Sequence, residues 1–187
     1  VCSSDLDSRS IGFFANGQLR RLDLAGGASQ TLATVTNARG GTWNANGVIL
    51  FAPNYASPIF RVPASGGSAT PATALSEQPS HRFPVFLPDG RNFLFYAQGG
   101  PNAGIYLGTL DTKSVTLLTL ADTAGTFLPS GYLVWARRGT LLAQRLDPER
   151  HALTGDTITF FYDVDDRLIR IEDSAGRAAQ LVRVALG

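Results

Sequence analysis

NGVILFA, at residues 46–52, decides the fold: it is a turn ending in Gly followed by a short apolar strand that closes on Ala. Related stretches recur along the chain. The alanines that close the four copies are Ala15, Ala52, Ala97 and Ala136. They stand roughly 40 residues apart, which is close to the length of a four-stranded propeller blade. The repeat therefore predicts about four antiparallel blades.

Each closing Ala is followed by a loop, a second strand with alternating character, a turn and a third strand. The expected second strands are residues 18–24, 59–63, 104–110 and 140–146. The expected third strands are residues 30–35, 73–75, 115–120 and 153–158. Inner strands are expected before the Gly turns, at residues 39–43 and 82–87. The predicted fold class is all-β: a partial β-propeller of about four antiparallel blades, with a C-terminal β-hairpin-like segment.

The apolar positions of the repeat predict how the blades pack. The residues just before the closing Ala are expected to fill one set of layers between blades: Phe14, Phe51, Tyr96 and Trp135. Side chains alternate along a strand, so the residues one position earlier are expected on the opposite face. These are Phe13, Leu50, Phe95 and Val134. A blade has two apolar faces and buries them only against its neighbours.

Composition agrees with many short strands joined by turns. Charged residues make up 17% of the chain, whereas Gly and Pro number 20 and 10, and the net charge of +1 gives no reason to expect a nucleic-acid partner. No apolar run reaches the roughly 18 residues that span a bilayer. The single cysteine, Cys2, cannot form an internal disulfide.

The chain contains no Met, even at position 1, which indicates a fragment. Residues 1–6, VCSSDL, back-translate to a common sequencing adapter and are expected to be a non-coding artefact. The expected division is therefore residues 1–6 as adapter, 7–156 as partial propeller and 157–187 as a hairpin segment. This last segment is either a single repeat of another type or a chimeric tail.

No catalytic, cofactor-binding or metal-binding residues are predicted. His81 and His151 are far apart in the repeat, and a solvated or loop-bonding role is expected for His81. Asp163, Asp165 and Asp166 lack the central Gly and final Glu of a calcium loop, so a polar hairpin turn is expected. A paired-carboxylate hydrolase stays open on sequence alone, although nothing else in the chain supports one.

Other motifs also have plain structural interpretations. No Gly-x-Ser-x-Gly nucleophile elbow is present. The pairs Gly66-Gly67 and Gly99-Gly100 fall where the repeat needs turns and are not expected to cradle phosphate. A solvated face is expected to account for the arginines spread over different blades, and nucleic-acid binding is not expected. These arginines are Arg20, Arg21, Arg137, Arg138 and Arg145.

FLPDGR at residues 86–91, with the apolar run behind it, resembles the TolB-type β-propeller repeat. The stretches at residues 40–53 and 139–148 resemble, more narrowly, the C-terminal sensor propellers of bacterial membrane-anchored Ser/Thr protein kinases. Residues 157–177 resemble a YD repeat of the Rhs type, with Asp166 in place of the expected Gly. The kinase motifs are absent from this sequence, so no phosphoryl-transfer residue is carried over.

The resemblance implies a noncatalytic, ligand- or protein-binding sensor propeller, with no enzymatic activity in this chain and no cofactor. The partner is expected to be a protein or small molecule at a propeller rim, without nucleic-acid or membrane contact by this segment. An extracytoplasmic, periplasmic location follows from the resemblance alone. Two alternatives remain open: the scaffold propeller of a hydrolase whose catalytic domain lies elsewhere, or a secreted YD-repeat protein.

Overall fold

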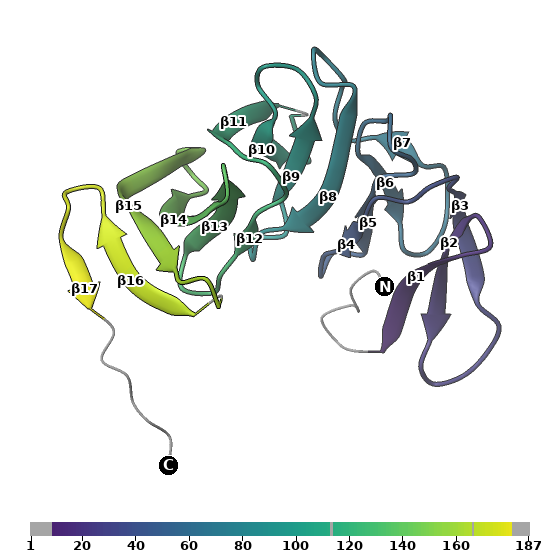
Figure 1. Cartoon of the computed structure of the whole chain (residues 1–187). Coiled ribbons are helices and arrows are strands. Elements are labelled where there is room, and N and C mark those ends of the chain that lie inside the picture. Colours follow the sequence, from purple (N-terminus) through teal and green to yellow (C-terminus); the bar gives the residue numbers. More distant parts are fainter. Residues whose placement is uncertain (1–8, 113, 166, 181–187) are drawn as a thin grey trace. The chain divides into compact units, whose positions relative to one another are not determined.

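The computed structural model describes residues 9–112, 114–165 and 167–180. The chain divides into two compact units, with the boundary between Leu120 and Ala121. Every regular element in the described residues is a β-strand, and the strands form four antiparallel sheets (Figure 1). This confirms the all-β prediction, and four such sheets are those of a partial β-propeller.

The first unit holds three sheets whose strands are neighbours in sequence order. The first sheet consists of β1 (Ser10–Ala15), β2 (Gln18–Asp23) and β3 (Gln30–Thr34). The second consists of β4 (Gly41–Trp43), β5 (Val48–Phe51), β6 (Phe60–Pro63) and β7 (Thr70–Pro71). The third consists of β8 (Ser80–Phe86), β9 (Asn92–Gln98), β10 (Gly104–Thr109) and β11 (Val115–Leu120).

The second unit is a single sheet of six strands. Its strands are β12 (Thr126–Phe127), β13 (Tyr132–Arg137), β14 (Thr140–Asp147), β15 (Ala152–Tyr162), β16 (Leu168–Asp173) and β17 (Ala178–Gln180). The expected C-terminal hairpin is present, because β16 pairs antiparallel with β15. β15 runs without a break through the expected boundary after residue 156, so the separate origin of the tail stays a prediction.

The tight hairpins follow from local sequence. Asn16 and Gly17 connect β1 to β2 with φ of 52° and 71°, and Arg138 and Gly139 connect β13 to β14 with φ of 51° and 73°. Two consecutive positive φ angles match the right-handed twist of the flanking strands, and Asn-Gly is the pair that reaches them most easily. Arg138 adopts the same backbone, and its N–H donates to a carboxylate oxygen of Asp122.

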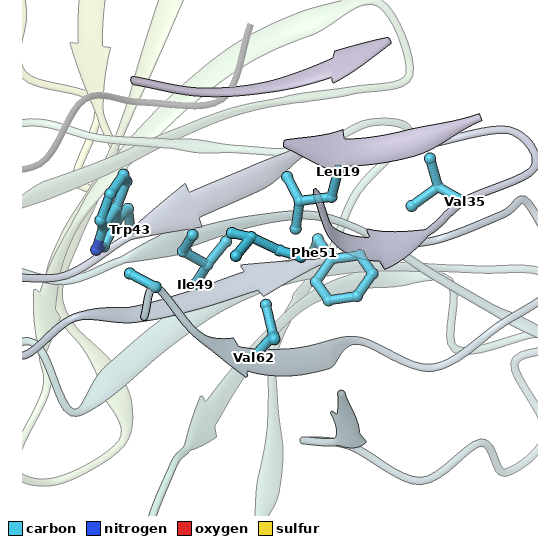
Figure 2. Close-up of a cluster of buried hydrophobic side chains, with 8 residues drawn as sticks. Leu19, Val35, Trp43, Ile49, Phe51 and Val62 are labelled. Carbon is cyan, nitrogen blue, oxygen red and sulfur yellow. The ribbon is translucent and has the colours of Figure 1, made fainter. Parts of the chain in front are cut away.

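The core of the first unit lies between its sheets. Leu19 from β2, Trp43 from β4 and Phe51 from β5 belong to one buried cluster between the first and second sheets (Figure 2). A second cluster joins Leu50 of the second sheet to Phe95 of the third. Leu50 and Phe51 therefore serve opposite faces of one sheet, as the alternation of side chains requires.

The predicted equivalence of Phe51 and Tyr96 is wrong. The Val48 carbonyl accepts the bond that closes the β4–β5 turn, and the Asn92 carbonyl accepts the one that closes the β8–β9 turn. Three residues further along, Phe51 is equivalent to Phe95, and both face the preceding sheet. Ala97 follows Asn92 by five positions, whereas Ala52 follows Val48 by four, so counting back from the closing Ala puts β9 one residue out of step and on the wrong face.

The third strand expected at residues 73–75 is also misplaced. β7 ends at Pro71, and the Ala72 N–H instead donates to the Ile59 carbonyl at 2.8 Å. The Thr73 hydroxyl accepts from the Ile59 N–H at 3.0 Å. These bonds turn the chain away from the outer edge of the second sheet and towards β8.

Candidate functional site

A surface pocket of about 420 Å³ opens at the end of the first and second sheets that carries the β4–β5 turn. It is lined by Arg21 from β2, Trp43 from β4, residues 44–48 at the β4–β5 turn and the start of β5, and residues 63–65 at the end of β6. Its volume falls within the range of about 300 to 1,000 Å³ that is usual for ligand sites. We call it the rim pocket.

Arg21 ties one wall of the rim pocket to the other. Its Nη1 donates to the Ala64 carbonyl at 3.2 Å, and its guanidinium lies 5.6 Å from the centre of the Trp43 ring. Its Nη2 donates to Asp23 Oδ1 at 2.7 Å. Hydrogen bonds from Ser10 and then Arg21 lower the pKa of Asp23. The Arg21 charge is therefore already balanced, and the pocket wall is polar without a free charge.

Asn44 fixes the turn that forms the floor of the rim pocket. Its side chain is buried, and its Oδ1 accepts from the backbone N–H groups of Asn46 and Val48 at 3.1 and 2.9 Å. Its Nδ2 donates to the Gly90 carbonyl at 2.7 Å. One amide thus shapes the β4–β5 turn and holds it against the β8–β9 turn of the third sheet.

His81 is buried, so of its two expected roles the solvated one is wrong and the loop-bonding one is correct. It lies on β8 with 3% of its surface exposed, and its ring centre is 4.7 Å from that of Phe95. Its Nδ1 is 2.8 Å from Thr73 Oγ1, which also accepts from the Ile59 N–H. Burial lowers the pKa of His81 to about 4, so the imidazole is neutral at physiological pH. It acts as a core residue that fastens the loop before β8.

The carboxylates singled out in the sequence shape turns. Asp163 Oδ1 accepts from the backbone N–H groups of Asp165 and Arg167, each at 2.9 Å. Asp166 lies outside the described residues, as does Cys2. Within the described ranges, no three His, Cys, Asp or Glu side chains gather closely enough to hold a metal ion.

The remaining sequence candidates lie in turns as well. His151 adopts a φ of 52° in the turn between β14 and β15. Gly66, Gly67, Gly99 and Gly100 all have positive φ angles, which a turn requires. The solvated role expected for Arg21 is wrong, because Arg21 packs on Trp43 and bonds to the second sheet. Sequence gave no signal for this contact, since the two residues belong to different repeats.

No protein-family model matches the chain, and no curated protein matches it. Solved structures do match. TolB from Acinetobacter baumannii is 18% identical with a TM-score of 0.63, over 78% of this chain and 40% of that one. A protein assigned as TolB from Agrobacterium tumefaciens is also 18% identical with a TM-score of 0.63, over 95% of this chain and 78% of that one. The chain thus spans well under two thirds of the first of these proteins. The likeness confirms the propeller fold.

The prediction that this chain is not an enzyme is wrong, because enzymes share its fold. Oligogalacturonate lyase in complex with manganese matches with a TM-score of 0.62 at 15% identity, over 96% of this chain and 63% of that one. Puromycin hydrolase matches with a TM-score of 0.55 at 17% identity, over 89% of this chain and 35% of that one. Enzymes therefore share the architecture, which carries no argument against catalysis.

Proposed function

We propose that this chain is the ligand-binding part of a β-propeller and that the rim pocket receives the ligand. The observation that carries the proposal is the pocket between two sheets, with Arg21 fastened across it to Ala64 and Trp43. Loops at the rim of a rigid scaffold are where propellers and similar folds place their binding residues. The pocket is built before the ligand arrives, which lowers the entropy lost on binding.

The charge balance of the pocket favours a neutral, polar ligand. Asp23 neutralises Arg21, so a charged ligand would have to displace an existing ion pair. Asn46 and Ser65 line the pocket beside the main chain of the turn, and amide and hydroxyl groups suit a sugar or a peptide segment. We therefore assign a saccharide or short peptide to this site.

A fluorescence titration tests the proposal. In the Trp135→Phe variant, Trp43 is the only remaining tryptophan, and it lines the pocket. Titration with a panel of disaccharides and short peptides is expected to change its emission for at least one probe. Ala45→Trp places a bulky ring at the pocket and is expected to abolish that binding, read by calorimetry. The matched Ala175→Trp variant, in a turn of the other unit, is expected to bind normally. Equal binding by both variants would rule out the rim pocket.

The cellular role belongs to the same proposal. The resemblance of residues 40–53 and 139–148 to kinase sensor propellers supports an extracytoplasmic sensor of a bacterial Ser/Thr kinase-type receptor. Among the described residues, no helix has the length and apolar character to cross a membrane. The genomic sequence on both sides of this segment tests the role, because a kinase domain followed by a membrane-spanning segment must precede the propeller.

A further inference from the structure

Arg39 and Phe83 lie where the inner strands of the second and third sheets meet. The Phe83 N–H donates to the Arg39 carbonyl at 2.7 Å, and the Arg39 N–H donates to the Ala52 carbonyl at 2.9 Å. Nearer the rim pocket, the Phe86 N–H donates to Thr42 Oγ1 at 3.3 Å. The backbone of Arg39 is thus fixed from both sides, between β5 and β8.

The backbone at this junction is strained so that an aromatic ring stays outside the core. Phe83 has a φ of 52°, a left-handed conformation that bulky residues rarely adopt, and it is 42% exposed. It lies in the β8 bulge between Arg82 and Val85. Opposite it, Gly40 has a φ of 90°, and an added Cβ would lie 3.0 Å from the Phe83 Cα. Bulges of this kind re-aim a side chain, often next to functional sites.

The charge at the junction is not balanced within the described part of the chain. The Nε of Arg39 is buried and has no hydrogen-bond partner there. Arg82 donates to Ser80 Oγ at 2.6 Å and to the Tyr55 carbonyl at 3.1 Å, both neutral acceptors. Neither arginine forms an ion pair with a described carboxylate. Arg39 and Arg82 are only partly buried, so two unneutralised guanidinium groups stand at the junction that holds the exposed Phe83.

We propose that Arg39, Gly40, Arg82 and Phe83 form a second binding site, for a carboxylate attached to an apolar or ring-bearing group. The planar guanidinium fork of Arg39 matches the two oxygens of a carboxylate. The exposed Phe83 ring would pack on the apolar part of the ligand. This site shares no residue with the rim pocket and is independent of the function proposed for that pocket.

NMR titration of the whole chain with hippurate tests the proposal. Hippurate carries a carboxylate and a ring, hippuramide is its neutral counterpart, and inorganic phosphate is an anion of different shape. Hippurate is expected to shift the amide signals of Gly40 and Phe83 and to bind about tenfold more tightly than either comparison probe. Equal affinity for hippuramide, or tighter binding of phosphate, would overturn the carboxylate assignment.

Variants separate a binding role for Arg39 from a structural one. Arg39→Met keeps an unbranched apolar stem and removes the guanidinium with its buried Nε donor. It is expected to weaken hippurate binding about tenfold while leaving Tm unchanged or higher. The matched Arg138→Met variant, at an exposed turn, and the rim-pocket variant Ala45→Trp are both expected to bind hippurate normally. A marked fall in Tm for Arg39→Met, or unchanged binding, would show that Arg39 is structural.

Discussion

His81 and Arg21 take their properties from contacts that cross between repeats. His81 gains a neutral imidazole because a loop of the second sheet and Phe95 of the third exclude water from it. Arg21 connects the first sheet to the second because its guanidinium donates a hydrogen bond to the Ala64 carbonyl, which follows β6. At this scale, function depends on which neighbour a side chain meets, and residue type alone does not decide it.

The buried histidine predicts how stability depends on pH. The pKa of His81 falls from 6.5 in the unfolded chain to about 4 in the folded one, so acid favours the unfolded state. Above pH 7, His81 is neutral in both the folded and the unfolded chain and does not lower the free energy of unfolding. This free energy is expected to fall by on the order of 2 to 3 kcal/mol as the pH drops towards 4. Urea unfolding at a series of pH values measures this loss.

His81→Phe is expected to flatten the pH dependence between pH 6.5 and 5, where few carboxylates titrate. His151→Phe, in the turn between β14 and β15, is expected to keep it. The same slope in both variants would show that His81 is not the group responsible.

The number of residues between a turn and the closing Ala decides which aromatic faces the preceding sheet. Ala97 follows Asn92, where the β8–β9 turn closes, by five positions, whereas Ala52 follows Val48, where the β4–β5 turn closes, by four. Phe95 therefore takes the place that Phe51 has in the second sheet. The ring of Phe93 lies directly against the backbone of β10 at Gly108. A Cβ at that position would lie 2.5 Å from the ring, so the packing requires glycine there.

The contact between the two turns can be tested at Asn44. Asn44→Asp keeps the oxygen that accepts from Asn46 and Val48 but removes the amide donor to Gly90. It also places a negative charge beside a carbonyl in a buried position. The variant is expected to lose about 1 to 3 kcal/mol in the free energy of unfolding, measured by urea denaturation.

The control for Asn44→Asp is Asn46→Asp, the same change two residues later at an exposed position of the same turn. Its free energy of unfolding is expected to stay within about 0.5 kcal/mol of that of the parent chain. If the two variants are equally stable, the bond to Gly90 does not hold the turns together.

Across the whole molecule, apolar side chains remain on strand surfaces. On β11, the outer strand of the third sheet, Val115 and Leu117 are 40% and 37% exposed on the same face. β11 is also an edge strand, because within the described residues its only strand partner is β10. Exposed apolar edges of this kind favour pairing between molecules.

We expect the chain to self-associate, and Leu117→Lys to reduce that association. A lysine at position 117 removes an exposed apolar side chain and places a charge in any contact made by the apolar face of this edge. Sedimentation velocity over a range of concentrations measures the effect. Thr116→Lys, on the other face of β11, is the matched control and is expected to associate as the parent chain does. A parent chain that stays monomeric at every concentration would contradict the prediction.

The repeat by itself determined the all-β class, the number of sheets and most strand positions, because turn residues and alternating apolar residues act locally. It could not determine that Phe95 and not Tyr96 faces the second sheet, that His81 is buried, or that Arg21 reaches Trp43. It also gave no sign of the junction between Arg39 and Phe83. Those features depend on where each turn closes along the strand and on contacts between separate repeats, and only the tertiary structure brings such residues together.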